Sequence, residues 1–266
     1  MLRGPFALRS RRARALALLV IVLLTLLTQL GGVVLWPLVG LGVSLSPQAR
    51  WALVPVSVLG WVLFGAFAVP LLAALAGRTP LPCTPDGALA PRSIVFCLGL
   101  RNYVRSDLRD EALAIAEDVR AGDPSAQVRY LDGAFPLGPY FPILPHLSHG
   151  DGRRLDIALV FEDGTGSPLG YFGYAPLDPD EQPACPSQWL DRRWDLDALQ
   201  PLFGPPRLDV SRSSRILRAA IARPRITRVL LEPHVSHELG VRATKLVFQG
   251  CRAARHDDHM HVEVAP

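Results

Sequence analysis

The C-terminal stretch Arg-His256-Asp-Asp-His259-Met-His261-Val-Glu-Val264 decides how the fold is interpreted. From His259 onward, polar and apolar residues alternate with a period of two, which predicts a β-strand with one buried face. His259 and His261 are two positions apart on this strand, so both imidazoles leave on the same face. The chain therefore ends in a sheet strand with two histidines on one side.

A second polar cluster lies about 100 residues earlier in the chain: Pro-His146-Leu-Ser148-His149-Gly-Asp-Gly152-Arg-Arg154-Leu-Asp156-Ile. An apolar run over 155–161 predicts a strand that begins near Asp156, and His149 precedes it in a loop. This arrangement lets a loop histidine and a strand-entry carboxylate converge on one ion. Two imidazoles and one carboxylate form a three-ligand zinc site with an open fourth position, which is typical of catalytic sites.

Each cluster alone is weak evidence, because histidines on solvated strands and His–Asp pairs on surfaces are common. Five of the seven histidines nevertheless fall into these two short segments, and both segments contain carboxylates. The hydrophobic pattern gives no reason for such a concentration. The two clusters together therefore indicate a metal site.

The sequence around the clusters mixes strands and helices without regular βαβ alternation. This predicts an α+β fold with a small, mainly antiparallel sheet and flanking helices. Strands are expected over 94–98, 128–131, 155–161, 229–231 and 259–264, and helices over 107–120, 195–202, 211–222 and 233–239, with long loops over 132–145 and 162–188.

Residues 1–77 have the composition of a membrane anchor. The segment 15–36 is almost wholly apolar and, at 1.5 Å per residue, is long enough to cross a hydrocarbon core of about 30 Å. The segment 51–76 is uncharged and contains Trp51 and Trp61 as interface anchors. Two transmembrane helices are thus expected, with membrane lipid around residues 15–76, a linker over 78–92 and a domain over 93–266. A cleaved signal peptide is the alternative for the first segment, although its apolar stretch is usually only about 7–15 residues long.

The positive charge belongs to the anchor. Six of the 28 basic residues lie in residues 1–77, all of them arginine, which leaves 22 against all 24 acidic residues in the remainder. The sequence pI of about 9.1 is therefore due to the N-terminal arm. The soluble part has no charge pattern for nucleic acid, and we expect no nucleic-acid partner.

The cysteines and the arginines predict opposite sides of the membrane for the domain. Cys83, Cys97, Cys185 and Cys251 are an even set without a CxxC motif, which suits disulfides in an oxidising compartment. Buried reduced thiols are the alternative. Five arginines before the first span predict a cytoplasmic N-terminus, and two spans then return the chain to the cytoplasm. We expect a plasma (inner) membrane protein with a periplasmic, extracytoplasmic domain, which requires an incomplete second span or an N-terminus outside. Otherwise the domain is cytoplasmic.

The pattern His146-x-Ser148-His149-x-x-Gly152-x-x-x-Asp156, followed by His256-x-x-His259-x-His261, resembles the penicillin-insensitive murein endopeptidases. These belong to the wider group of lysostaphin-type enzymes, D-Ala-D-Ala peptidases and the hedgehog signalling domain. The likeness covers roughly residues 94–266, and only the two histidine clusters are specific. It implies one zinc ion held by His149, Asp156 and His261, with His259 and His256 as catalytic residues. It also places His146, Ser148 and Arg154 near the substrate, although Arg154 departs from the family pattern.

The resemblance implies a metallopeptidase that hydrolyses amides of D-amino acids, with peptidoglycan crosslinks or muropeptides as substrate. Because a helical HExxH motif is absent, the general base is expected to be His259, and Asp258 to point to the opposite face. Glu263 is on the same face as His261 and is a candidate hydrogen-bond partner for a ligand imidazole. Two alternatives stay open: a zinc-stabilised binding or signalling domain without activity, and a membrane protein with scattered histidines whose soluble part only binds partners.

Overall fold

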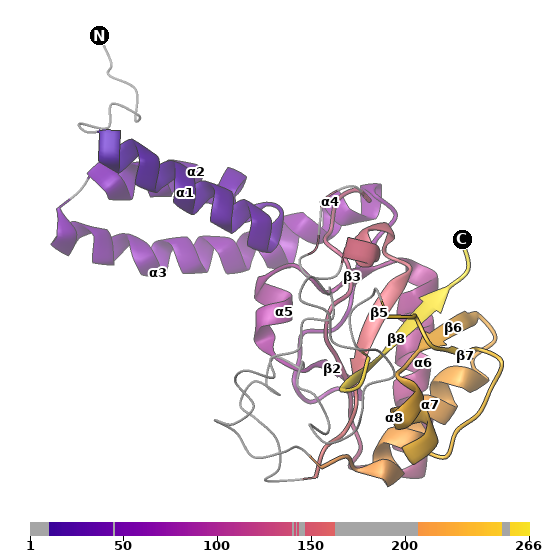
Figure 1. Cartoon of the computed structure of the whole chain (residues 1–266). Helices are drawn as coiled ribbons and strands as arrows, with labels where there is room; N and C mark the ends of the chain where they lie inside the picture. Colours follow the sequence, from indigo (N-terminus) through magenta and orange to yellow (C-terminus); the bar gives the residue numbers. More distant parts are fainter. Residues whose placement is uncertain are drawn as a thin grey trace.

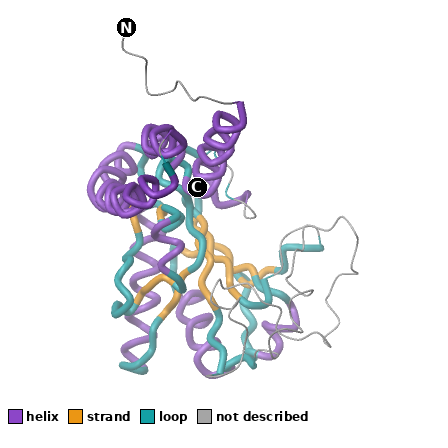
Figure 2. The backbone as a smooth tube through the Cα atoms, turned by 90° about the vertical axis from the view of Figure 1, so that its left-hand side faces the viewer, coloured by secondary structure: helices purple, strands orange, loops and turns teal. Residues whose placement is uncertain are grey.

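The computed structural model describes residues 11–44, 46–139, 141, 143, 147–162, 207–251 and 256–266. Within these ranges the chain forms a group of N-terminal helices and a domain of strands and helices (Figure 1). A view at right angles shows the N-terminal helices gathered at one end, apart from most of the strands (Figure 2). Several predictions, on His146, Cys185, the helix over 195–202 and the loop over 163–188, lie outside the described residues.

The N-terminal part is a helical hairpin followed by one long helix. The hairpin consists of α1 (Arg11–Thr28) and α2 (Gly31–Ser44), and the long helix of α3 (Pro47–Leu63), the π-helix η1 (Phe64–Ala68) and α4 (Val69–Leu75). The single helix predicted over 15–36 is therefore wrong, because the chain reverses at Gln29, whose φ is 66°. Gly32 permits the tight reversal, since a Cβ there would lie 2.0 Å from Thr25 Oγ1.

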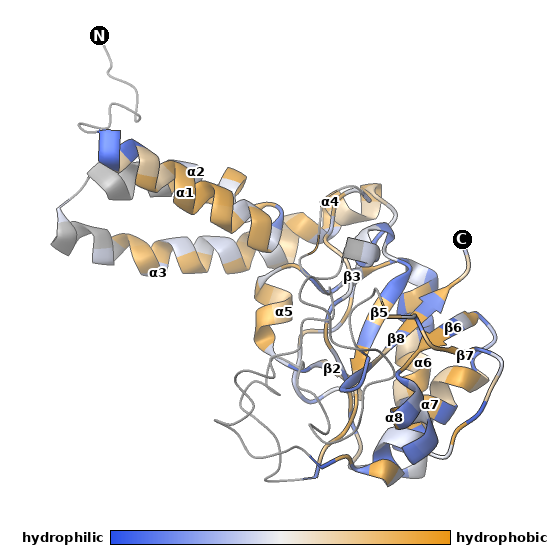
Figure 3. Ribbon diagram, viewed as in Figure 1, coloured by the Kyte–Doolittle hydropathy of each residue, from blue (hydrophilic) through white to orange (hydrophobic). Residues whose placement is uncertain are grey.

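Among the described helices, one is long and apolar enough to cross a membrane. It runs over Leu53–Leu75 and coincides with the second predicted span. The stretch α1 is also apolar beyond its first turn (Figure 3), but Arg11, Arg12 and Arg14 lie in that turn. Two complete transmembrane helices therefore stay a prediction.

The domain contains a mixed sheet that is more parallel than predicted. Its strand order is β2-β4-β5-β8-β6-β7, and a two-stranded antiparallel sheet joins β1 to β3. The described central pairs β4–β5, β5–β8 and β6–β8 are antiparallel, whereas the outer pairs β2–β4 and β6–β7 are parallel. The strands are β1 (Thr79–Pro80), β2 (Leu89–Pro91), β3 (Tyr103–Val104), β4 (Val128–Tyr130), β5 (Arg154–Ala158), β6 (Ile226–Leu230), β7 (Leu246–Val247) and β8 (His259–Val264).

The α+β class is confirmed, and the parallel pairs have a simple origin. A parallel neighbour needs a crossover connection, and helix α6 (Ser106–Gly122) lies in the connection between β2 and β4. The helices predicted over 107–120, 211–222 and 233–239 are found as α6, α7 (Val210–Ala222) and α8 (Pro233–Glu238).

The register of β5 and β8 separates an apolar face from a polar one. Leu155 faces Val262 and Ile157 faces Met260, and these side chains join one core with residues of α6 and α7. Asp156 lies opposite His261 on the other face. Because side chains alternate along each strand, one face of β5 and β8 packs into the core and the other face carries the polar cluster.

Two segments differ from the prediction. Residues 78–92 are not a linker, because they contain β1, β2 and the buried Leu81 and Leu89. The run expected as a strand over 94–98 is the helix α5 (Ile94–Leu98), which starts where the Ser93 hydroxyl accepts a hydrogen bond from Val95 N. Periodicity cannot distinguish a short apolar strand from a short helix. Here the N-cap hydrogen bond of Ser93 favours the helix.

Candidate metal centre

Three elements bring the polar residues of the two clusters together. His149 lies on the 3-10 helix η2 (Leu147–Asp151), Asp156 on β5 and His261 on β8. His149 Nε2 is 3.1 Å from His261 Nδ1 and 3.3 Å from Asp156 Oδ1, and His261 Nδ1 is 2.9 Å from the same oxygen. All three side chains are buried, with 0–2% of their surface exposed. His149 and His261 are 112 positions apart in the sequence, yet their side chains and that of Asp156 direct three donor atoms to one point.

These residues fit a divalent metal ion. In a tetrahedral site with bonds of about 2.0–2.1 Å, neighbouring ligand atoms are about 3.3 Å apart. The three separations of 2.9–3.3 Å are close to that value. Burying a carboxylate is costly without a compensating charge, and a cation between Asp156 and the two imidazoles supplies one. The group His149, Asp156 and His261 could therefore hold a metal ion.

The backbone beside Asp156 fixes the orientation of His149. Its Nδ1–H donates to the carbonyl of Gly133 at 3.0 Å. A carbonyl oxygen only accepts, so Nδ1 carries the proton and the Nε2 lone pair faces the centre. Gly133 follows Asp132, whose carboxylate is held by two bonds from Arg101 at 2.5 and 2.8 Å, and whose carbonyl accepts from Asp156 N.

Glu263 and Arg154 hold the far side of His261. The Glu263 carboxylate lies 3.3 Å from His261 Nε2 and accepts a bond of 3.0 Å from Arg154 Nε. His261 and then Arg154 hold the pKa of Glu263 down, at about 2, although partial burial opposes the shift. Arg154 also donates to the carbonyl of Ser148. Arg154 was expected near the substrate, but its observed contacts join the loop of His149 to the partner of His261.

His259 is beside the three ligand atoms and is paired with an aspartate. Its Nδ1 donates to Asp258 Oδ1 at 2.5 Å, and its Nε2 is 3.8 Å from Asp156 Oδ2. Burial alone would lower the pKa of His259, but Asp156, Asp258 and Asp257 outweigh it and raise the pKa to about 9. Burial also lowers the pKa of His261, but Asp156 and Glu263 outweigh this effect and raise the pKa above its ordinary value.

The expectation that Asp258 points away from His259 is wrong. Strand alternation starts at His259, and Asp258 precedes the strand, so its side chain is free to turn towards the imidazole. No pattern in the sequence signals this pairing. The adjacency of Asp258 and His259 was the only available hint.

Of the remaining predicted site residues, His256 lies close to the centre. Its ring centroid is 4.9 Å from that of His259 and 5.5 Å from that of His261. Its backbone carbonyl accepts a hydrogen bond from Glu232 N, which ties the segment before β8 to the end of β6. Ser148 is exposed on η2, and His146 lies outside the described residues.

The cysteines support disulfide formation. Cys83 and Cys97 form a disulfide that joins the segment after β1 to α5. Cys251 is also disulfide-bonded, while Cys185 lies outside the described residues. The alternative of reduced thiols is therefore wrong for Cys83, Cys97 and Cys251.

One further contact could not be predicted from the sequence. Arg78, directly after the long N-terminal helix, is buried and donates to the carbonyls of Phe135, Gly138 and Gly150. Gly150 adjoins His149, so Arg78 holds the loop that carries a candidate ligand. An arginine after an apolar segment usually marks a membrane boundary, which conceals this second role.

The site was also compared with known proteins. The chain matches no known protein-family model and no curated protein sequence.

Proposed function

We propose that the chain is a zinc-dependent hydrolase of peptide amides that contain D-amino acids, acting on peptidoglycan crosslinks. The observation that supports it best is the convergence of His149 Nε2, Asp156 Oδ1 and His261 Nδ1, with His259 beside them. The resemblance of the two histidine clusters to the murein endopeptidases supplies the substrate class. The kinds of donor atom indicate which metal is expected.

Zinc is the ion that best suits this donor set. Imidazole nitrogens favour zinc and later transition metals over magnesium or calcium, which prefer all-oxygen sites. Three protein ligands leave one position for water or substrate, whereas structural zinc sites are closed by four. The three buried donors of His149, Asp156 and His261 match the open arrangement.

The residues around the ion divide the chemical tasks. When bound, zinc supplies Lewis-acid activation of a water and of the scissile carbonyl. His259, oriented by Asp258, holds or accepts a proton at Nε2. His256 adds a second imidazole within 5 Å of His259, measured between ring centroids. Glu263 and Gly133 keep the two ligand imidazoles in the required orientation.

The paired His259 favours a hydrolase over a zinc-stabilised binding domain. A purely structural ion needs its ligands and their partners only. His259 does not belong to the three-residue ligand group, yet it is buried and its Nδ1 is bonded to a carboxylate. Such a buried pair costs desolvation energy, and a role in proton handling accounts for that cost.

We infer that the domain lies on the extracytoplasmic side, where peptidoglycan lies, and the arrangement of the helices supports this. α1 begins and α2 ends at the far end of the hairpin, and the turn at Gln29 contacts Leu137 of the domain (Figure 1). The hairpin thus returns to its starting side, so the helix over Leu53–Leu75 sets the net change of side. Arg11, Arg12 and Arg14 are at the end away from the domain, which the positive-inside rule makes cytoplasmic.

This arrangement removes the conflict between arginines and cysteines. With a hairpin and one crossing, an arginine-rich cytoplasmic end and an oxidising environment for the domain are compatible. The Cys83–Cys97 disulfide is then in a compartment where disulfides persist.

The test is hydrolysis of purified crosslinked muropeptides by the full chain in detergent, with and without chelator. We expect one zinc per chain, activity that chelator removes and zinc restores, and loss of both zinc and activity in His149→Ala. His237→Ala, which changes an exposed histidine on α8, is the matched control and keeps both. A His149→Ala protein with full zinc content rejects the ligand set, and zinc without hydrolysis in the wild-type chain favours the binding-domain alternative.

A further inference from the structure

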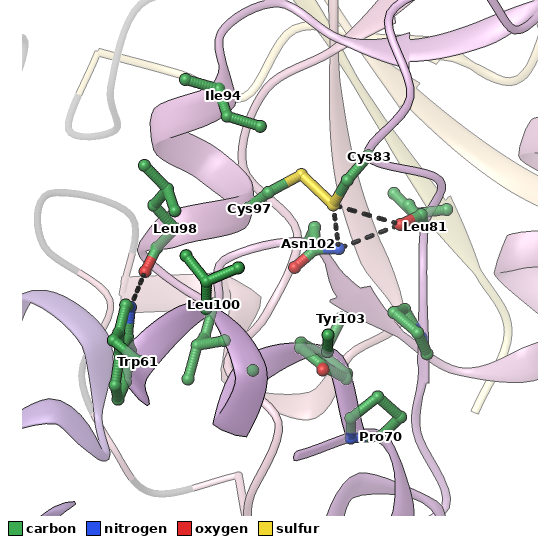
Figure 4. Close-up of a pocket in the computed structure, with 14 residues that line it drawn as sticks. Trp61, Pro70, Leu81, Cys83, Ile94, Cys97, Leu98, Leu100, Asn102 and Tyr103 are labelled. Atoms are coloured by element: carbon green, nitrogen blue, oxygen red, sulfur yellow. Dashed lines mark hydrogen bonds between the residues drawn. A yellow bond between two sulfur atoms is a disulfide. The ribbon is translucent and has the colours of Figure 1, made fainter. Parts of the chain in front are cut away.

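A cavity of about 320 Å³ lies between the long N-terminal helix and the domain (Figure 4). On the helix side it is lined by Trp61, Gly65 and Pro70 among others, and on the domain side by Leu100 and Tyr103. The Cys83–Cys97 disulfide forms part of the wall. The volume falls within the range of small-molecule sites, which is about 300–1,000 Å³.

The wall of this cavity is mainly apolar, and the side-chain N–H groups of Asn102 and Trp61 are already bonded. Asn102 Nδ2 donates to the carbonyl of Leu81 at 2.9 Å and to Cys83 Sγ at 3.3 Å. Trp61 Nε1 donates to the carbonyl of Leu98 at 2.9 Å. None of the described lining residues has a charged side chain. A ligand in this cavity would therefore be held mainly by apolar contact.

The cavity borders the candidate membrane crossing. Its helix wall belongs to the segment Leu53–Leu75, the candidate crossing. The two elements that border the cavity carry exposed apolar side chains: Phe67 on the helix at 70%, and Ile94 and Leu98 on α5 at 50% and 43%. α5 is coloured as apolar beside α3 (Figure 3). Hydrocarbon rather than water is the favourable surrounding for these side chains.

Small residues of the π-helix make room for an occupant. Gly65 and Ala66 lie in η1, where the helix is wider than an α-helix. The atom nearest to a Cβ on Gly65 would be Leu100 Cδ2 at 3.6 Å, an ordinary contact distance. A larger side chain at these positions would occupy the cavity itself. The opening thus depends on small residues at one turn of the helix.

We propose that this cavity binds a hydrocarbon chain of a membrane lipid, which enters from the bilayer between the helix and α5. The proposal rests on the membrane span of the proposed function and is independent of the metal chemistry. The mainly apolar lining, the bonded N–H groups of Asn102 and Trp61, and the exposed apolar side chains on the helix and on α5 all suit an acyl chain. A charged ligand would find no oppositely charged side chain among the described lining residues.

The experiment uses the full chain in phosphatidylcholine vesicles that contain a phospholipid with a photoactivatable diazirine on one acyl chain. After irradiation, peptide mapping locates the crosslinks. We expect labels on Leu81 and Leu100, which are 2% and 3% exposed and are out of reach of lipid that stays outside the cavity. Gly65→Phe is expected to reduce these labels at least fivefold, since the ring fills the space.

Gly60→Phe is the matched control, because it puts the same side chain on the same helix where a Cβ meets only open space. It is expected to leave the internal labels unchanged. Ala66→Phe is a second filling variant, and formation of the Cys83–Cys97 disulfide reports folding in all three. Labels confined to exposed residues such as Ile94, or equal internal labelling in Gly60→Phe and Gly65→Phe, overturn the proposal.

Two further measurements separate this proposal from the proposed function. Alkaline extraction before irradiation reports whether the chain is integrated in the membrane. A chain that is extracted as a soluble protein overturns both the span and the lipid site. Absence of internal labels in an integrated chain with normal zinc content and hydrolysis overturns the lipid site alone.

Discussion

At the scale of single residues, the candidate centre depends on partners that set which nitrogen faces the ion. His149 is held through Nδ1 by the Gly133 carbonyl, and His261 has Glu263 beside its Nε2. The other nitrogen of each ring, His149 Nε2 and His261 Nδ1, therefore faces Asp156. Such outer partners keep ligand atoms aligned before the metal arrives.

Asp258→Asn tests the pairing of His259. We expect zinc content to stay the same, because Asp258 is not in the ligand group, and hydrolysis to fall by about 10- to 100-fold. The pKa of His259 is raised partly by Asp258, so the histidine limb of the pH–rate profile should move to lower pH. Asp118→Asn, on the exposed face of α6, is the control. Loss of zinc together with activity would show that Asp258 is structural.

Zinc binding should release protons at neutral pH. Asp156 and Glu263 raise the pKa of His261 despite its burial, so the metal-free imidazole is protonated above its ordinary pKa of about 6.5. Zinc needs the Nδ1 lone pair and displaces that proton. The apparent affinity therefore increases with pH beyond about 6.5 until the raised pKa is passed. Calorimetry in buffers of different ionisation enthalpy measures the release, and a pH-independent affinity above neutrality contradicts it.

At the scale of secondary-structure elements, the N-terminal helices are joined directly to the loop of the candidate centre. Arg78 follows α4 and donates to three carbonyls of the segment 135–150. Gln29, at the turn between α1 and α2, accepts from Leu137 N at 2.8 Å and donates to the Leu137 carbonyl. Two separate points of the anchor thus hold the loop that leads to His149.

Arg78→Ala tests this connection. It leaves buried carbonyls of Phe135 and Gly150 without a donor, which should lower the free energy of unfolding by about 2–4 kcal/mol. We expect zinc affinity to fall as well, because η2 loses its support. Arg78→Lys should recover part of the loss at most, since an ammonium cannot reproduce the planar fork.

Arg218→Ala is the control, since Arg218 makes one exposed bond to the Gly240 carbonyl far along the chain from η2. Thermal unfolding in detergent and competition with a zinc indicator measure the two effects. Equal behaviour of Arg78→Ala and Arg218→Ala would contradict a role for the anchor in positioning the loop.

At the scale of the whole molecule, the proposed topology has one crossing helix and a returning hairpin, and it predicts an extracytoplasmic domain. A reporter enzyme that is active only outside the cytoplasm, fused after Pro266, should be active, and a reporter that works only in the cytoplasm should not. Replacing Arg11, Arg12 and Arg14 by Glu should reduce this asymmetry, because the positive charges hold the far end in the cytoplasm. A C-terminal reporter active only in the cytoplasm contradicts the topology.

Much of the architecture was predictable from local pattern, and the resemblance of the two histidine clusters implied the candidate ligand set. The strand over His259–Val264 follows from alternation, and the helices α6 and α7 from their apolar spacing. Concentration of histidines and carboxylates in two segments indicated the residues that converge. These features are predictable because period and donor chemistry are properties of a few consecutive residues.

The remaining features depend on contacts between distant residues, which no local pattern encodes. The sequence by itself determined an α+β domain behind an apolar, arginine-tipped segment and, through the resemblance, the candidate donors His149, Asp156 and His261. Only the tertiary structure decided that the first apolar segment turns back at Gln29, that Asp258 orients His259, and that Arg78 supports the loop. The physical reason is that contacts between distant parts of the chain set the direction of side chains outside regular strands. The same contacts set the hydrogen-bond partners of the buried Arg78 guanidinium.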